Sequence, residues 1–350
     1  MKDLSFYQGR RVFITGHTGF KGSWLCRILI NLGAQVTGYS LEPPTDPSLF
    51  SMAGLEGRIT SVIGDIRDFD ALKKAFDSTL PEIVLHLAAQ PLVRDSYERP
   101  RYTYETNVMG TVNILECVRC SSSVKSFLNV TTDKVYKNNE WVWGYRENEP
   151  LDGYDPYSNS KSCSELVTHS YKRSFFDGRK VAVSTARAGN VIGGGDFSAN
   201  RIIPDCVRAV EKGAPIAVRN PFSTRPYQHV LEPLFAYLTI AQKQYEDIKY
   251  AGWYNVGPDE CDCLNTGELV NMFCTAWGNN ARWVNKSDGG PHEANFLKLD
   301  SSKLKSTFGW RPTWHIAEAV GRVVQWTRVY FDKGNIPAEM DHEIRDFMEA

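Results

Sequence analysis

The sequence predicts an α/β protein with a doubly wound parallel sheet and a smaller C-terminal lobe. Short apolar runs alternate with helical patterns through the first half of the 350-residue chain. A glycine-rich turn follows the first apolar run, and beyond about residue 189 the regular alternation gives way to segments rich in glycine and proline. Strands that alternate with helices of about ten or more residues are typical of a parallel sheet covered by helices on both faces.

Each element follows from its own pattern. Strands are expected over residues 11–15, 35–39, 59–63, 83–87, 126–130 and 183–187, where apolar residues form short runs. Helices are expected over residues 22–32, 71–76, 107–118, 202–212 and 232–241, and another begins near Tyr157. We expect residues 1–189 to form the sheet domain, with a returning segment near 228–257, and residues 190–350 to form mostly the smaller lobe.

Composition narrows the class of protein. The chain carries 40 basic and 41 acidic residues, and this balance gives no reason to expect nucleic acid as a partner. No run approaches 18 apolar residues, and the polar N-terminus lacks the apolar core of a signal peptide, so we expect a cytoplasmic protein with no membrane span. The eight cysteines are expected to be free thiols. Neither Cys117 with Cys120 nor Cys261 with Cys263 has metal-ligand partners nearby in the sequence, so no metal is expected.

The glycine-rich turn predicts a dinucleotide site. Gly16, Gly19 and Gly22 lie between the first strand and the first helix in GxxGxxG spacing. Glycine lets the backbone approach a pyrophosphate, and the helix N-terminus offers free N–H groups to it. A bare tight turn is the alternative. His17 and Phe20 belong to the same loop and are included among the expected cofactor contacts. His17 and Lys21 either project into solvent, or the bulk of His17 crowds the pyrophosphate.

The end of the second strand favours NAD over NADP. No Lys or Arg lies between Thr37 and Phe50 to hold a 2′-phosphate. Ser40 or Glu42 can meet the ribose hydroxyls, and Asp65 with Ile66, after the third strand, is placed to reach the adenine.

Tyr157 and Lys161 form the expected catalytic pair. They are four residues apart on a helix that Asp155 and Pro156 begin, so both lie on one face. Tyrosine has a pKa near 10 and is a poor base at neutral pH, but a nearby ammonium group and a positive nicotinamide ring lower that pKa. With the glycine loop, this pair predicts oxidation of a hydroxyl group.

Together these motifs resemble the extended short-chain dehydrogenase/reductase family over nearly the whole chain. The matching residues are the three loop glycines, the His-Leu-Ala-Ala run at 86–89, Asn107, Tyr157 and Lys161. The resemblance implies a Rossmann-like fold, NAD as cofactor, and Tyr157 as the base while Lys161 holds the nicotinamide ribose. It also implies that Ala88 and Asn107 lie at the cofactor, and that the chain is a homo-oligomer, a dimer or a tetramer paired through the helices near Asn107 and Tyr157.

A second set of motifs resembles the nucleotide-sugar 4,6-dehydratases, and among them the branch that acts on CDP-glucose. It comprises Thr132-Asp133-Lys134 and the runs at 87–94 and 224–230. The resemblance implies oxidation at C4, loss of water across C5–C6 and return of hydride to C6, which yields a 4-keto-6-deoxy sugar for deoxysugar biosynthesis. A dehydratase or C4 epimerase for a dTDP-, UDP- or GDP-linked sugar, and a non-catalytic NAD-sensing protein, remain as alternatives.

The same resemblance implies roles for these side chains. Thr132 would bind the 4-hydroxyl group and Asp133 would protonate the departing hydroxyl. Lys134 would either remove the C5 proton or stabilise the enolate electrostatically. Residues expected to contact the nucleotide sugar are Arg94, Asn190, Arg201, Arg225 and His292. Arg201 precedes the helix expected at 202–212, where a guanidinium and a helix N-terminus can bind phosphate together.

Overall fold

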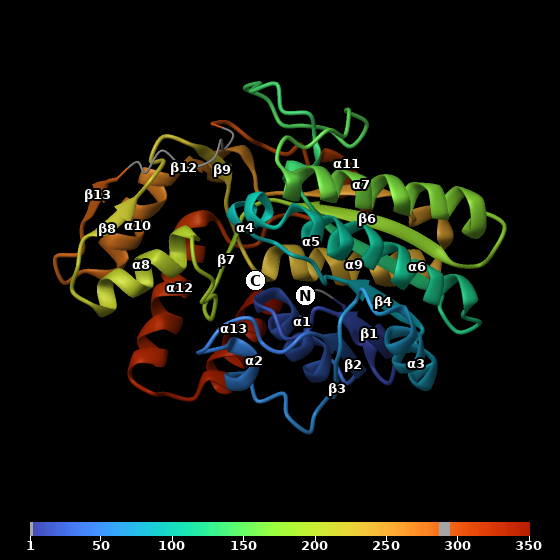
Figure 1. The fold of residues 1–350 in the computed structure, drawn as a ribbon. Coiled ribbons are helices and arrows are strands. Elements are labelled where there is room, and N and C mark those ends of the chain that lie inside the picture. Colours follow the sequence, from blue (N-terminus) through green and yellow to red (C-terminus); the bar gives the residue numbers. More distant parts are fainter. Residues whose placement is uncertain (1–2, 287–294) are drawn as a thin grey trace.

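A seven-stranded sheet forms the centre of the protein (Figure 1). The computed structural model describes residues 3–286 and 295–350. Every pair of neighbouring strands is parallel, in the order β11-β6-β5-β4-β1-β2-β3. The strands are β1 (Arg11–Thr15), β2 (Gln35–Ser40), β3 (Thr60–Ile63), β4 (Ile83–His86), β5 (Ser126–Thr132), β6 (Ala182–Ala188) and β11 (Trp253–Val256). The predicted doubly wound fold is confirmed.

Helices cover both faces of this sheet (Figure 1). One face packs against α1 (Phe20–Asn31), α9 (Leu231–Glu246) and α13 (Ile336–Glu349), and the other against α3 (Phe69–Thr79), α6 (Gly110–Cys120) and α7 (Pro156–Tyr171). Successive residues of a strand point to opposite faces. Accordingly Val12 and Ile14 belong to the first hydrophobic core and Phe13 to the second. This double burial explains why the strands read as continuous apolar runs.

The smaller lobe lies beside the carboxyl ends of the strands, at the left of Figure 1. It contains α8 (Ile202–Glu211), α10 (Thr266–Trp277) and α12 (Ile316–Phe331), which surround a separate core that includes Ile203, Phe273 and Val323. Three two-stranded sheets complete it: β7 (Val191–Ile192) with β10 (Gln228–His229), β9 (Thr224–Pro226) with β12 (Cys263–Asn265), and β8 (Ile216–Val218) with β13 (Trp283–Asn285). Between these segments the chain returns to the large sheet as α9 and β11.

Short elements connect the main ones. They are α2 (Leu49–Met52), α4 (Val93–Glu98), α5 (Pro100–Tyr104) and α11 (Ser302–Phe308), with π-helical turns at Glu105–Met109 and Lys172–Phe176. Short 3-10 helices lie at Ser5–Tyr7, Asp133–Val135, Ile248–Tyr250 and Glu260–Asp262. Within the described residues, no helix combines the length and apolar character that crossing a membrane requires. All eight cysteines are free thiols, as predicted.

Candidate active site

A large pocket lies at the carboxyl ends of the central strands. It has a volume of about 1400 Å³ and is lined by both the sheet domain and the smaller lobe. β1 and β4 are neighbours, and the chain winds outward from them in opposite directions. Such a switch point is where open α/β sheets bind ligands. The volume exceeds the roughly 300–1,000 Å³ that is usual for one small-molecule site, so the pocket has room for more than one ligand.

The glycine loop forms one wall of this pocket, and two of its glycines are required by the protein's own packing. Gly16 has φ +82°, and a Cβ there would lie 2.8 Å from the backbone nitrogen of Ala88. A Cβ at Gly22 would lie 2.1 Å from the carbonyl oxygen of Gly16. A Cβ at Gly19 would meet only that carbonyl oxygen, at 3.5 Å. Gly19 precedes α1 and no side chain caps this helix, so its first N–H groups are available to a pyrophosphate.

His17 lies behind the loop, and the expectation that it projects into solvent is wrong. Its side chain is fully buried and does not line the pocket. Its Nε2 lies 2.7 Å from Ser61 Oγ, and its ring packs edge-on against Phe50. A Cβ at Gly38 of β2 would lie 2.2 Å from the imidazole, so that glycine makes room for the ring. Burial lowers the pKa of His17 to about 4, which keeps the ring neutral.

The side chain of Lys21 also differs from expectation, because it turns toward the pocket. Lys21 is half-buried and lines the pocket beside Gly19 and Phe20. Burial, together with the positive charges of Arg201 and Lys161, lowers its pKa to about 7. This direction could not be predicted from the motif, because the other residues that line the pocket come from distant parts of the chain.

The end of the pocket beyond β2 and β3 contains the residues expected at the adenosine. Ser40, Asp65 and Ile66 all line it. Ser40 Oγ lies 2.8 Å from the hydroxyl of Thr18, and the carboxylate of Asp65 accepts a 2.6 Å bond from Arg67. The pocket therefore presents hydroxyl and carboxylate oxygens here, which suit ribose hydroxyls and an amino-substituted base.

Tyr157 and Lys161 lie together on the first turns of α7, and both line the pocket. Asp155 caps this helix by accepting from the Ser158 N–H at 2.9 Å, and Lys161 Nζ donates to the carbonyl of Val130 at 3.2 Å. Burial lowers the pKa of Lys161 to about 8. Burial raises the pKa of Tyr157 to about 12, opposed by a hydrogen bond with the Thr132 side chain and by the charge of Arg201. The protein's own groups thus do not give the low tyrosine pKa that the sequence predicted.

The Thr-Asp-Lys run lies where β5 ends. β5 continues two residues beyond its predicted end, because Thr131 and Thr132 pair with Arg187 and Ala188 of β6. The Thr132 hydroxyl donates to Asp133 Oδ1 at 2.9 Å. Asp133 is fully buried, and its Oδ2 has no hydrogen-bond partner within the described part of the chain. Thr132 and Lys134 line the pocket directly, whereas Asp133 lies just beneath its surface.

Ala88 and Asn107 differ in their exposure to the pocket. Ala88 lines it, as predicted from the family resemblance. Asn107 is buried and does not line it. Its Oδ1 accepts from the Gln90 N–H at 2.8 Å, while its Nδ2 donates to the Gln90 carbonyl and to Ser160 Oγ. Asn107 therefore ties the loop after β4 to α7, and its expected contact with the cofactor stays a prediction.

Residues expected to bind substrate line the opposite wall. Arg94, Asn190, Arg201 and Arg225 all face the pocket, and His292 lies outside the described residues. Arg201 precedes α8 and pairs with the buried Asp196 at 2.9 Å. The sequence reasoning missed Asp196, which follows the Gly193–Gly195 turn and fixes the Arg201 guanidinium at the pocket.

A second missed residue, Glu165, lies one turn after Lys161. Its side chain is fully buried beneath the pocket and accepts hydrogen bonds from Thr131, Thr185 and Arg187. The Arg187 side chain is equally buried, and its Nη2 lies 3.0 Å from Glu165 Oε2. The spacing of four from Lys161 is the signal that could have identified Glu165, whose negative charge raises the pKa of Lys161 against the effect of burial.

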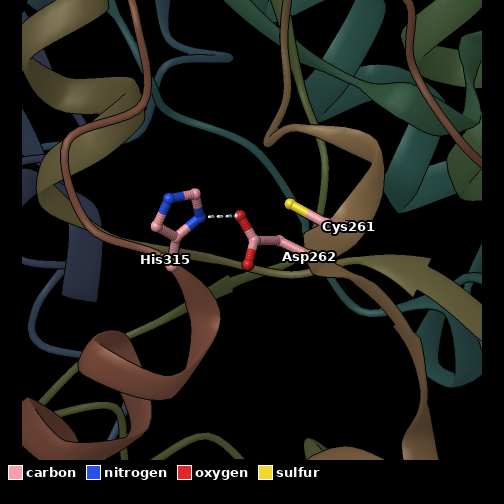
Figure 2. A group of neighbouring side chains, drawn as sticks. All are labelled: Cys261, Asp262 and His315. Carbon is pink, nitrogen blue, oxygen red and sulfur yellow. Dashed lines mark hydrogen bonds and ion pairs between the residues drawn. The ribbon is translucent and has the colours of Figure 1, made fainter.

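Away from this pocket, Cys261 has neighbours that its sequence context did not reveal. Figure 2 shows Cys261 beside Asp262 and His315, with one potential ligand atom from each within 4.8 Å of the others. Asp262 accepts from His315 Nδ1 at 2.8 Å and from the Ile316 N–H at 3.0 Å. Both carboxylate oxygens thus hold the start of α12, so capping accounts for this group.

The fold and the pocket define a class, namely the nucleotide-sugar enzymes of the short-chain dehydrogenase/reductase type. The family model for GDP-mannose 4,6 dehydratase matches residues 13–323. The chain belongs to this family of dehydratases.

Comparisons with individual proteins support the same family. A CDP-glucose 4,6-dehydratase of Salmonella typhimurium is 49% identical over 100% of this chain and 99% of the relative. A probable dTDP-glucose 4,6-dehydratase of Sinorhizobium fredii is 28% identical over 93% of both chains. Among solved structures, the NAD complex of the Bacillus anthracis dTDP-glucose 4,6-dehydratase has a TM-score of 0.77 at 20% identity, covering 93% of this chain and 99% of the other. The UDP-glucose 4-epimerase of Thermotoga maritima has a TM-score of 0.80 at 21% identity, over 92% and 99%.

Proposed function

We propose that this protein is an NAD-dependent CDP-glucose 4,6-dehydratase, which converts CDP-glucose to CDP-4-keto-6-deoxyglucose and water. The observation that carries the proposal is the joint position of Tyr157 and Lys161 with Thr132 and Lys134 around one pocket. The 49% identity over the full chain to a CDP-glucose 4,6-dehydratase supports the reaction and the substrate.

The protein's residues fit NAD. The uncapped start of α1 and the open side of Gly19 suit the pyrophosphate, and Ser40 and Asp65 suit the adenosine. Lys161 would hold the nicotinamide ribose. Once bound, the nicotinamide supplies a hydride acceptor for C4 and a donor for C6, and its positive charge favours the phenolate of Tyr157.

The remaining steps fall to side chains of this chain. Tyr157 takes the proton of the 4-hydroxyl as the C4 hydrogen leaves with its electron pair, and Thr132 orients that hydroxyl. The resulting ketone acidifies the C5 hydrogen. For the elimination, the proton shared by Lys134 and Asp133 passes to Asp133. Neutral Lys134, at the pocket surface, then takes the C5 proton, and Asp133 protonates the C6 hydroxyl so that water departs. Hydride then adds at C6 and a proton returns to C5, so the reaction has no net redox change.

Arg201 and Arg225 are proposed to hold the diphosphate of the nucleotide sugar, with Asn190 and Arg94 at the sugar and nucleotide. The ion pair between Arg201 and the buried Asp196 supports this role for Arg201, because it fixes the guanidinium group at the pocket wall.

One assay tests the substrate and the reaction together. The protein is incubated with NAD and with CDP-, dTDP-, UDP- or GDP-linked glucose, and the products are identified by mass and by NMR. The proposal expects a 4-keto-6-deoxy product with CDP-glucose in clear preference to the others. Preference for another nucleotide would overturn the CDP assignment, inversion at C4 would identify an epimerase, and binding of NAD with no turnover would identify a sensing protein.

Assembly and compartment complete the proposal. We propose a cytoplasmic homo-oligomer, a dimer or a tetramer, paired through the π-helical turn with α6 and through α7. Exposed apolar side chains on and beside these helices support the pairing: Tyr104, Met109, Leu166 and Phe175. Eight free thiols suit a reducing compartment. The molar mass in solution, from light scattering, tests the assembly.

A further inference from the structure

The pocket contains a lysine whose role the proposed reaction leaves open. Lys21 is in the first turn of α1, two residues after Gly19, and its side chain lines the pocket. Its ammonium group forms no hydrogen bond or ion pair with any residue of ranges 3–286 and 295–350. Half-buried lysines without a partner are unfavourable, because burial disfavours the charge without a compensating anion.

The surroundings of Lys21 are mostly positive. Arg201, Lys161 and Lys134 line the same pocket and their charges lower the pKa of Lys21, whereas the Asp133 carboxylate raises it. Asp133 already accepts from Lys134 at 3.0 Å, and the counter-ion of Arg201 is Asp196 at 2.9 Å. The protein therefore supplies four cations around this part of the pocket and leaves Lys21 without an anion of its own.

We propose that Lys21 is a diphosphate-binding residue, whose ammonium group pairs with a phosphate of a nucleotide ligand of this pocket. Two features indicate that the Lys21 side chain binds phosphate in addition to the backbone of the glycine loop. The Lys21 side chain extends from the same helix N-terminus whose N–H groups suit an anion, and it lines the same pocket as Arg201. A negatively charged ligand between these cations would relieve their mutual repulsion.

Both proposed ligands carry a diphosphate, so the source has to be distinguished by experiment. The inference rests on the proposed function only in that the pocket takes nucleotide diphosphates. The variants are Lys21→Met, which keeps the length but removes the charge, and Lys21→Arg, which retains a charge. The folded state of each is checked by circular dichroism and by the melting temperature. Titration calorimetry then measures NAD and CDP separately, each without the other ligand.

Lys21→Met is expected to weaken binding of at least one ligand by about 10-fold or more, and Lys21→Arg to restore much of that loss. Weakened NAD binding alone assigns Lys21 to the cofactor, weakened CDP binding alone assigns it to the substrate, and loss of both places it between the two diphosphates. Unchanged or tighter binding of both ligands by the Met variant would overturn the proposal, as would an equal loss in both variants.

The pH dependence of binding gives a second readout. Lys21 has a pKa of about 7 in the protein, and a bound phosphate raises that pKa. The wild-type affinity should therefore fall as the pH rises from about 7 toward 9, because binding takes up a proton there. The Met variant should lack this part of the pH dependence, and an identical profile would contradict the proposal. Neither titration requires turnover, so a failure of the dehydratase assay and a failure of this proposal are separate results.

Discussion

Lys134 Nζ lies 3.0 Å from Oδ1 of the buried Asp133 and 3.2 Å from Oδ1 of Asn190. The elimination step is assigned to Lys134 and Asp133, and these two side chains are in direct contact. Asn190, which follows the neighbouring strand β6, helps to orient the Lys134 ammonium group. Lys134 is partly exposed to the pocket, whereas the Asp133 side chain is fully buried. The pair can thus work on adjacent carbons of one sugar.

Replacing Lys134 tests its role at C5. Lys134→Met should lower kcat by roughly 10²–10⁴, the usual contribution of a positioned acid or base, with NAD binding largely retained. The measurement is incorporation of deuterium from heavy water at C5 of the substrate or product, followed by NMR. Exchange at the wild-type rate would show that another group removes the C5 proton.

Thr132 should set the pH dependence of the oxidation step. Burial raises the pKa of Tyr157 to about 12, even though a hydrogen bond with the Thr132 side chain lowers it. The base form is the phenolate, so activity rises with pH through the Tyr157 pKa. Removing the hydrogen bond in Thr132→Val raises that pKa, and the rising limb of kcat/KM should move to higher pH by about one to two pH units.

Thr132→Ser keeps the hydroxyl and provides the matched control. The rising limb of its kcat/KM profile should stay near the wild-type pH. If Thr132→Val loses activity equally at all pH values, the hydroxyl acts on the substrate alone and not on Tyr157.

Asp196 should influence substrate affinity through Arg201. Asp196→Asn keeps the shape but removes the charge that fixes the guanidinium. The expected result is an increase in KM for CDP-glucose of about 10-fold with a much smaller change in kcat, because ground-state binding is affected more than chemistry. Asp259→Asn is the control, because this acid pairs with Lys305 and does not line the pocket. A fall in kcat at unchanged KM would contradict a binding role for Arg201.

Glu165 should contribute strongly to stability. Glu165→Gln leaves Arg187 buried without its counter-charge, and we expect a loss of about 3–5 kcal/mol in the free energy of unfolding by denaturant titration. Glu318→Gln removes an acid from an exposed ion pair with Arg322 and should change stability by less than about 1 kcal/mol. Equal effects of the two changes would refute the buried network.

The same carboxylate predicts a pH dependence. Arg187 and the hydrogen bonds of its neighbours hold the pKa of Glu165 well below its usual range. A lowered folded pKa stabilises the protein above the unfolded pKa of about 4.3, and this contribution is lost as the pH falls below it. The difference in stability between wild type and Glu165→Gln should therefore shrink at acid pH. A constant difference from neutral to acid pH would mean that the charge is not its cause.

Most strands of the sheet could be predicted because the signal for each strand lies within a short stretch of the sequence. Each strand is a short apolar run, and β1 leads into the glycine loop where the pattern indicated it. β5 extends to Thr132 because it pairs with β6, and that pairing is not visible in the run itself. β11 was not predicted as a strand, since its four residues lie far from the regular alternation.

Within the pocket, motif residues were predicted more readily than side-chain directions. Tyr157 and Lys161 follow from their helical spacing together with the glycine loop. His17 turns inward because Gly38 leaves space on the neighbouring strand, and Lys21 lines a pocket that the smaller lobe completes. Such directions depend on contacts between distant segments, which a motif does not contain.

Internal hydride transfer is the central claim, and CDP-glucose deuterated at C4 tests it most directly. Incubated with the protein and NAD, this substrate should give a 4-keto-6-deoxy product that carries the deuterium at C6, with no accumulation of NADH. Deuterium retained at C4, or released into free NADH with an unreduced sugar product, would contradict the account.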